Sequence, residues 1–240
     1  MEHDQPASLH RFVRSLRKGF SSAPENKVLP VTTEKRYERM PQLQLPAPDV
    51  ITTGLTDVIL ERQSLSGKDA KMQPLSLPLQ TCSNLLGNAV AARGYHKRGY
   101  PSGGGLTPIE LYLVGTLEGS ATPMVYHYAP TIHTLEALWP VTAPTMAQLI
   151  NTERSTRGSH VIILTARWGQ ATQKYRGFSY YLALLEAGHL AQNLLLCATA
   201  LAVPARPIGG FDDALATSLL DLHERGEDAL YVITFSPKNG

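Results

Sequence analysis

An α+β fold is predicted for this chain by three features of its sequence. Helical and strand patterns follow one another along the 240 residues without a regular strand–helix–strand repeat. The unbroken apolar run within 160–166 is typical of a strand that is buried on both faces. The longest apolar segment, 179–202, is typical of a helix that runs through the protein core. We therefore expect an antiparallel-dominated sheet flanked by helices around a long buried central helix.

The first fifty residues differ from the rest of the chain. Four apolar residues fall on one face of a helical pattern, and arginines surround the other face. These four are Leu9, Phe12, Val13 and Leu16. The prolines within 24–48 predict an extended arm outside the core. We expect an N-terminal helix and arm, 1–50, and a body, 51–240. The basic helix is expected to dock on the body or on a partner subunit; contact with a membrane surface or an acidic peptide is the alternative.

In the body, helical spacing of apolar residues predicts one helix over 55–65 and a second over 75–92, with Ser76 as the candidate N-cap of the second. Alternating patterns predict strands over 109–117 and 125–128 that pair as antiparallel neighbours. The other expected elements are a short helix or turn over 133–139, a small helix over 145–152, the buried strand over 160–166, the central helix, a short helix over 214–220 and a last strand over 229–235.

Composition excludes several classes of function. The chain is 43% apolar and 18% charged, and its net charge of +2 is too small to indicate a nucleic-acid-binding protein. The N-terminus has no apolar segment of the kind that a secretory signal contains, and polar residues within 180–203 argue against a membrane span. Cys82 and Cys197 lack metal-type spacing and are expected to be buried free thiols. We expect a cytoplasmic protein that binds neither nucleic acid nor membrane.

Two glycine-containing segments are candidate ligand-binding loops. Residues 101–105, Pro-Ser-Gly-Gly-Gly, match neither a Walker loop nor a dinucleotide-binding fingerprint. Their glycines let the backbone approach a flat or anionic ligand, and a plain turn is the alternative. Residues 207–212, Pro-Ile-Gly-Gly-Phe-Asp, offer either a backbone N–H for a ligand or a simple connection between helices. Asp212 or Asp213 is expected to cap the helix that follows.

Lys174 and Tyr175 stand directly before the central helix, and this pair is the most informative feature of the chain. Either side chain can serve as a general acid or base when its surroundings change its proton affinity. The alternative is a solvated turn between a strand and a helix. At the end of the first helix of the body, Arg62 and Ser64 are suited to hold a phosphate, and a solvated helix end is the alternative there.

Taken in chain order, five segments resemble the SagB-type dehydrogenases of the nitroreductase superfamily. They are 62–64 (Arg-Gln-Ser), 101–112, 125–128 (Val-Tyr-His-Tyr), 174–193 and 207–212. Within that group, the chain is most similar to the dehydrogenase subunit of microcin-type thiazole/oxazole synthetases, and the resemblance covers 55–235. The chain departs from the family pattern at Ser66, where a basic residue is common, and at Lys68, where an aromatic residue is expected. The candidates to supply the missing charge are Lys68, Lys71 and Lys238.

The resemblance implies a nitroreductase-like fold, a homodimer and FMN bound at the dimer interface. The residues implied for the cofactor are Arg62 and Ser64 at the phosphate and ribityl end, Pro101, Ser102 and Gly103 at the isoalloxazine ring from the partner subunit, and Gly209 and Gly210 near flavin N5. Lys174 and Tyr175 would be the catalytic residues, and no metal is implied. Because desolvation favours the neutral form of a lysine, Lys174 is the expected base and Tyr175 the donor or relay.

The implied reaction is the oxidation of a thiazoline or oxazoline in a peptide to the thiazole or oxazole, during biosynthesis of a ribosomally made, bacteriocin-type peptide. The implied partners are the azoline-containing precursor peptide and the cyclodehydratase subunits of a synthetase complex. The N-terminal arm is the candidate segment to bind a cyclodehydratase or the leader of the precursor.

Two other functions remain open. A flavin reductase that uses NAD(P)H on nitro or quinone compounds would share the FMN site without needing the Lys-Tyr pair. A non-catalytic scaffold subunit of a synthetase would bind no FMN. Glu186 and His189 have the spacing of a metal half-site, but no second copy of that pattern occurs, so we expect a buried, hydrogen-bonded pair. No Gly-x-Ser-x-Gly motif occurs, which argues against a hydrolase.

Overall fold

The computed structural model describes residues 5–21, 34–64, 76–93, 97–142, 145, 148–149, 160–223 and 226–236. In chain order the elements are α1 (Gln5–Ser21), β1 (Gln42–Gln44), α2 (Leu55–Glu61), α3 (Leu79–Val90), the 3-10 turn η2 (Gly103–Gly105), β2 (Ile109–Gly115), β3 (Met124–Ala129), β4 (Thr134–Pro140), β5 (His160–Arg167), α5 (Gly169–Tyr175), α6 (Phe178–Ala200), β6 (Ala205–Ile208), α7 (Asp213–Leu219) and β7 (Glu227–Phe235). Most of the small helix expected over 145–152 falls outside the described residues, as do Ser66, Lys68, Lys71 and Lys238.

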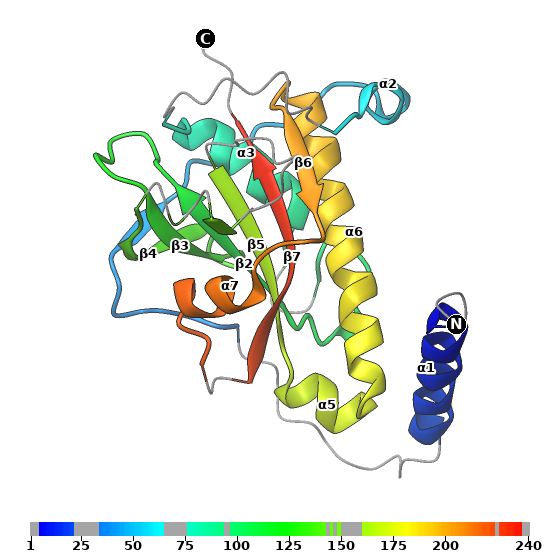
Figure 1. Ribbon diagram of the computed structural model, residues 1–240. Coiled ribbons are helices and arrows are strands. Elements are labelled where there is room, and N and C mark those ends of the chain that lie inside the picture. Colours follow the sequence, from blue (N-terminus) through cyan, green and yellow to red (C-terminus); the bar gives the residue numbers. More distant parts are fainter. Residues whose placement is uncertain are drawn as a thin grey trace.

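A seven-stranded sheet forms the centre of the described structure, in the order β1-β4-β3-β2-β5-β7-β6. Each pairing between neighbouring strands is antiparallel, including that of β2 with β3, which the sequence predicted. The helices α3 and α6 pack on one face and α7 packs on the other (Figure 1). The predicted α+β class, with an antiparallel sheet beside one long helix, is therefore confirmed.

Both faces of the central strands are buried, which explains their unbroken apolar sequences. On β2, Leu111 and Leu113 face the layer of α3 and α6, whereas Tyr112 and Val114 belong to the core on the opposite face. Strand β5 alternates in the same way, and all but its last residue are buried. Among the described residues, no helix combines the length and the apolar character needed to cross a membrane.

The described part of the N-terminal fifty residues packs against the body through α1 and through the segment around β1. The predicted amphipathic helix is confirmed as α1, which contacts α6 with Leu16 beside Gly177 and the Arg17 guanidinium 5.4 Å from the centre of the Phe178 ring. The segment expected as an extended arm outside the core adds β1 to the sheet, and Leu45 after it is buried. It does so because the backbone of an extended chain can pair with the open edge of β4.

Strand β4 lies where the sequence led us to expect a short helix or turn, so that prediction was wrong. The cause is Glu136, a buried carboxylate that is paired in register with His127 of β3. A charged residue at an inward position hides the two-residue period by which a strand is recognised. On the other face of β4, Leu135 and Ala137 pack in the same layer as α6.

Two further local predictions were wrong. Residues 205–208 form the edge strand β6 and not only a loop, and Pro207 is tolerated there because an edge strand does not need every N–H for pairing. Helix α3 begins at Leu79, so Ser76 is not its N-cap. The backbone of Leu77 is held extended before the helix by hydrogen bonds to the segment that follows β2.

The two cysteines are free thiols, as the sequence predicted. Cys82 on α3 is buried, and burial raises the pKa of its thiol to about 12. Cys197 on α6 is only half-buried, contrary to expectation, because it lies toward the edge of the helix face that packs on the sheet.

Candidate active site

Lys174 and Tyr175 lie in the last turn of α5, a short helix in a region that the sequence did not predict as helical. The helix follows β5 after one residue, Trp168, and ends at Arg176, whose φ of 51° turns the chain toward α6. Both side chains are half-buried, and Lys174 Nζ lies 5.3 Å from the centre of the Tyr175 ring. Helix α5 therefore presents an amine and a phenol side by side at the N-terminal end of α6 (Figure 1).

Residues 101–107, which we call the glycine loop, lie directly against this pair. The loop contains Gly104 and Gly105 with φ of 63° and 69°, a conformation that favours glycine. A Cβ atom added at Gly104 would lie 2.5 Å from Lys174 Nζ and closer still to the Tyr175 hydroxyl. Glycine at this position lets the ends of both side chains lie directly against the backbone. The fold thus brings two of the segments selected from the sequence into contact.

Glu186 on α6 lies beside the glycine loop, and its relation to the loop was missed at the level of sequence. The residue is 2% exposed. Burial raises the pKa of its carboxyl group to about 7, against the lowering effect of the nearby Ser102 side chain, the Gly103 backbone and the charge of Arg98. One carboxyl oxygen, Oε1, is buried without a hydrogen-bond partner among the described residues. The sequence signal for this group was a carboxylate at an inward position of an apolar helix.

The expected burial of His189 beside Glu186 is wrong, because His189 is exposed. Three residues along a helix leave a side chain about 60° from the starting direction, and His189 falls on the exposed side of α6 with Leu185, four residues before it. Within the described ranges, no group of three or more histidine, cysteine, aspartate or glutamate side chains is placed to hold a metal ion.

Arg62 and Ser64 lie near the opposite end of α6 from Lys174 and Tyr175. Arg62 lies at the C-terminal end of α2, and α2 contacts α6. The Arg62 side chain is half-buried, whereas Ser64 is exposed. Helix α6 has 23 residues, which corresponds to about 35 Å, and Figure 1 shows α2 and α5 toward its two ends. One chain alone therefore does not bring the expected phosphate site to the Lys-Tyr pair.

Gly209 and Gly210 follow the edge strand β6 and are exposed, as is Pro101 at the start of the glycine loop. A Cβ atom added at either glycine would meet nothing within 4 Å, so a ligand can approach this backbone from outside. Asp212 caps α7 as predicted, because its Oδ1 accepts the Leu215 N–H at 2.9 Å. These segments suit a ligand with a phosphate and a flat ring, such as FMN. Arg62 offers a guanidinium and Ser64 a hydroxyl for the phosphate, and Gly209 and Gly210 offer accessible backbone for the ring.

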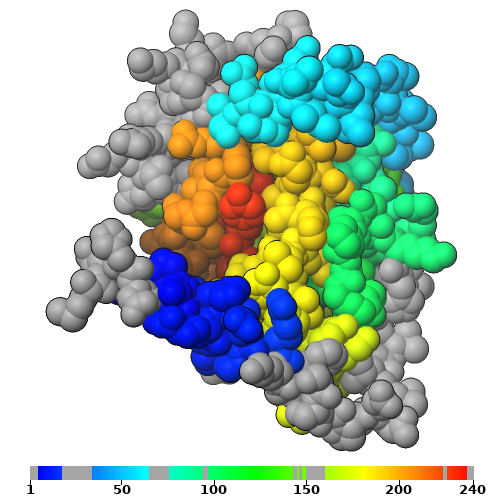
Figure 2. Space-filling model, turned by 90° about the vertical axis from the view of Figure 1, so that its right-hand side faces the viewer, coloured from blue at the N-terminus to red at the C-terminus, as the bar shows by residue number. Residues whose placement is uncertain are grey.

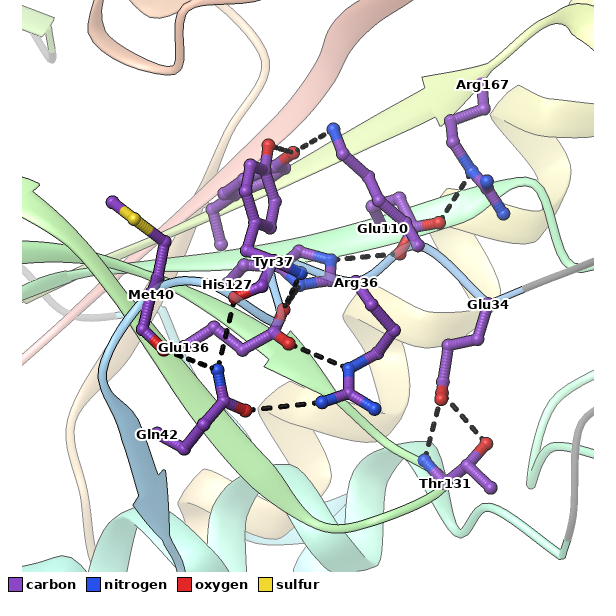
Figure 3. Close-up of polar contacts among 12 residues, drawn as sticks. Glu34, Arg36, Tyr37, Met40, Gln42, Glu110, His127, Thr131, Glu136 and Arg167 are labelled. Atoms are coloured by element: carbon purple, nitrogen blue, oxygen red, sulfur yellow. Dashed lines mark hydrogen bonds and ion pairs between the residues drawn. The ribbon is translucent and has the colours of Figure 1, made fainter.

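A buried network of charged side chains spans β2, β3, β4 and the end of β5, and it was not anticipated from the sequence (Figure 3). His127 is at its centre: Nδ1 lies 2.8 Å from Glu136 Oε2, and Nε2 lies 3.2 Å from Glu110 Oε2. Arg36 Nε donates to Glu136 Oε1 at 2.7 Å, and Arg167 Nε lies 2.6 Å from Glu110 Oε1. The network thus connects the segment before β1 to the end of β5, where α5 begins.

Within this network, the pKa values of His127 and Glu136 are shifted in the directions that favour the charged form of each side chain. Burial lowers the pKa of His127, but hydrogen bonds to Glu110 and Glu136 outweigh burial, and the pKa is raised. Burial raises the pKa of Glu136, but hydrogen bonds from His127, Arg36 and the Tyr37 backbone outweigh burial, and the pKa is lowered. We infer that the network is a row of alternating charges within the sheet.

Comparison with known proteins identifies a family. The model of the nitroreductase family matches residues 67–236. The microcin B17-processing protein McbC of Escherichia coli is 30% identical over 172 residues, which are 68% of this chain and 63% of McbC. A protein of Methanocaldococcus jannaschii named as a nitroreductase is 29% identical over 195 residues, which are 76% of this chain and 91% of that protein.

A solved structure gives a similar result. The E. coli microcin synthetase McbBCD complex with truncated pro-MccB17 bound matches with a TM-score of 0.65 and 25% identity. The match covers 92% of this chain and 87% of the matched chain.

Proposed function

This chain belongs to the nitroreductase family, and from that premise we propose that it is an FMN-dependent dehydrogenase that oxidises peptide thiazolines or oxazolines to thiazoles or oxazoles. The observation that favours this function is the contact between the glycine loop and the Lys-Tyr pair, which places an amine and a phenol at a candidate ligand site. The similarity to a microcin B17-processing protein and to a microcin synthetase complex supports the choice of substrate. By the same similarity, the proposed partners are an azoline-containing precursor peptide and the other subunits of a synthetase.

The residues of the chain fit FMN if the site is shared between two copies. Arg62 and Ser64 would hold the phosphate and ribityl end. The isoalloxazine ring would lie against Pro101, Ser102 and Gly103 of the other copy, with the backbone of Gly209 and Gly210 near N5. Because α2 lies toward one end of α6 and the glycine loop packs near the other, with Gly103 beside Leu182, a two-fold axis across the middle of that helix would bring the α2 end of one chain to the α5 end of its partner. Bound FMN would supply the hydride acceptor.

An exposed apolar surface along α6 supports this homodimer. Tyr180, Leu184 and Leu185 are exposed on α6, and Leu55, Ile59 and Leu60 are exposed on the neighbouring α2. Figure 2 shows α6 open to solvent between α1 and the segment that contains α2. Exposed apolar surface of this extent is typical of a protein interface.

The dimer can be tested with one charge placed on α6. Leu185→Lys is expected to give a monomer that loses most of its FMN, because the lysine would be buried against an apolar partner surface. Ile132→Lys is the matched control, since Ile132 is 41% exposed and Leu185 is 44% exposed, and Ile132 lies on the turn between β3 and β4. Light scattering gives the mass and visible absorbance gives the flavin content. A dimeric Leu185→Lys variant that retains its FMN would exclude this interface.

In the proposed reaction, Lys174 removes the proton on Cα of the azoline, which is acidified by the adjacent imine and carbonyl groups. FMN held by Arg62, Ser64 and the glycine loop would supply the acceptor for the Cβ hydrogen as a hydride, and the loss of both hydrogens would give the ring the second double bond that makes it aromatic. Tyr175 donates or relays a proton beside the amine. Molecular oxygen is the proposed final electron acceptor. Because Lys174 is only half-buried in one chain, the partner copy or the bound peptide would complete its desolvation.

The test is to purify the protein, record its visible absorbance and supply a synthetic azoline peptide in air. Flavin absorbance and a mass loss of two hydrogens from the peptide are the expected results. A protein that binds FMN and reduces nitro compounds with NAD(P)H, but leaves the azoline unchanged, would be a flavin reductase. A colourless protein that takes up no added FMN would be a scaffold subunit.

A further inference from the structure

We propose that Trp168 is a positioning residue that, through its hydrogen bond to Asp228, fixes α5 and thereby Lys174 and Tyr175. The effect on turnover rests on the proposed function, whereas the effect on α5 does not. Helix α5 itself has little to hold it: it has seven residues, only Ala171 is buried, and its N-cap residue makes no side-chain cap. Because a helix of this length is not stable alone, its position depends on the contacts at its two ends.

Trp168, the N-cap residue of α5, joins the start of the helix to the sheet. Its backbone N–H donates to the Gly226 carbonyl at 2.9 Å, and its own carbonyl accepts the Thr172 N–H at 2.7 Å. Its indole Nε1 donates to Asp228 Oδ2 at 2.5 Å. Asp228 is itself fixed, because its backbone is in register with Ala166 in the pairing of β5 with β7. One tryptophan therefore ties the first turn of α5 to the start of β7.

The same side chain also contacts α6. The Trp168 ring packs against the core beneath α6, and its centre lies 5.8 Å from the centre of the Tyr180 ring. At its other end, α5 is held by Ser179 of α6, whose Oγ donates to the Arg176 carbonyl at 2.6 Å. Helix α5 is thus held to β7 at its N-terminal end and to α6 at its C-terminal end, and Figure 1 shows it at the foot of β5 beside the start of α6.

Release of the N-terminal end would allow α5 to turn about its axis and would shift the ends of its side chains. Side-chain ends lie about 5–6 Å from a helix axis, so a rotation of about 10° moves them by about 1 Å. The Lys174 amine and the Tyr175 hydroxyl pack closely on the backbone of Gly104, so such a shift changes their surroundings. A displacement of about 1 Å can lower turnover by about 100-fold. We expect loss of one hydrogen bond to have part of that effect, on kcat more than on KM.

The experiment is a double-mutant cycle on full-length protein, with and without FMN. Trp168→Phe keeps an aromatic ring but cannot donate, Asp228→Ala removes the acceptor, and the third variant carries both changes. Amide hydrogen exchange followed by NMR is expected to be about 10-fold faster at Thr172 and Arg176 in each single variant, while exchange in β2 stays at wild-type rates. If the two residues act through one bond, the double variant should exchange no faster than either single variant.

Two further variants serve as controls. Asp228→Asn keeps an oxygen that can accept the indole N–H, and it should stay close to the wild type in both exchange and turnover. Glu38→Ala removes an exposed carboxylate from the turn before β1 and should change neither.

With an azoline peptide, kcat is expected to fall by about 10-fold in each single variant and no further in the double variant, while KM stays within about threefold. Wild-type exchange rates at Thr172 and Arg176 would overturn the proposal, as would additive effects in the double variant or equal losses in Asp228→Asn and Asp228→Ala. If Trp168→Phe does not fold, Asp228→Ala, at an exposed position, decides by the same local exchange. If the wild type binds FMN but does not oxidise azolines, the proposed function fails, and the exchange rates still decide whether Trp168 holds α5.

Discussion

Lys174→Ala is expected to lower azoline oxidation by about 10²–10⁴-fold while leaving FMN bound, since a positioned general base contributes that much to a proton transfer. The residues proposed to hold FMN do not include Lys174, and α5 is anchored by its own packing, with Ala171 buried and Trp168 bonded to Asp228. Azole formation from a fixed amount of azoline peptide, followed by mass spectrometry, gives the rate. Visible absorbance of the same sample gives the flavin content.

The matched control is Lys174→Arg, which keeps the positive charge but cannot give up its proton. If Lys174 acts as a base, arginine should be nearly as inactive as alanine. If Lys174 serves only to place a positive charge, arginine should restore most of the activity. Wild-type turnover in Lys174→Ala would remove the residue from the mechanism.

The contact at Gly104 gives an independent check of the same prediction. Gly104→Ala would push against Lys174 and Tyr175, whereas a Cβ added at Gly105 meets nothing within 4 Å. Both glycines have a positive φ, so both variants strain the backbone by a similar amount. Gly104→Ala should therefore lower turnover much more than Gly105→Ala does. If the two variants lose the same amount of turnover, backbone strain alone accounts for the effect.

Apolar periodicity was sufficient to predict the layers of the fold. The run at β5 was recognised because nearly all of its residues are buried. The run at α6 was recognised because it is apolar over most of its 23 residues, although only ten of them are buried in this chain. The alternation of β2 and β3 indicated an antiparallel pair. Periodicity failed at β4, where Glu136 occupies a buried position. It failed again at α5, whose seven residues bury a single side chain, Ala171. A helix with almost no apolar face leaves no helical period to detect.

The sequence predicted the separate segments of the candidate site, but it did not predict how those segments are arranged in space. Sequence could select Lys174 and the glycine loop, but it could not show that Gly104 packs on Lys174, because that contact depends on how α5 and η2 meet in space. It also gave no sign that α2, which Arg62 ends, packs toward the far end of α6. Charged residues such as Glu110 and His127 are usually solvent-exposed, so their role as mutual partners within the sheet required the structure.

The buried network leads to the largest expected effect on stability, which concerns Glu136. Glu136→Gln keeps the shape of the side chain but removes the negative charge between His127 and Arg36. Removing one partner of a buried ion pair typically costs about 3–5 kcal/mol, because the remaining charge stays buried without compensation. We expect the free energy of unfolding to fall by that amount in urea titrations. Glu61→Gln, at an exposed position, is the control and should stay within about 0.5 kcal/mol of the wild type.

The pH dependence of this loss follows from the two shifted groups. The pKa of His127 is raised above 6.5, so its contribution is complete below pH 6.5 and is lost as the pH rises through its folded-state pKa. The pKa of Glu136 is lowered below 4.5, so its contribution is complete above pH 4.5 and is lost as the pH falls through its folded-state pKa.

The difference in the free energy of unfolding between wild type and Glu136→Gln should therefore be greatest between pH 4.5 and 6.5. At higher pH it should shrink but persist, since Arg36 remains charged and bonded to Glu136. A difference that stays constant from pH 5 to 9 would mean that His127 is neutral in the folded protein, and that Arg36 alone accounts for the stabilising effect of the carboxylate.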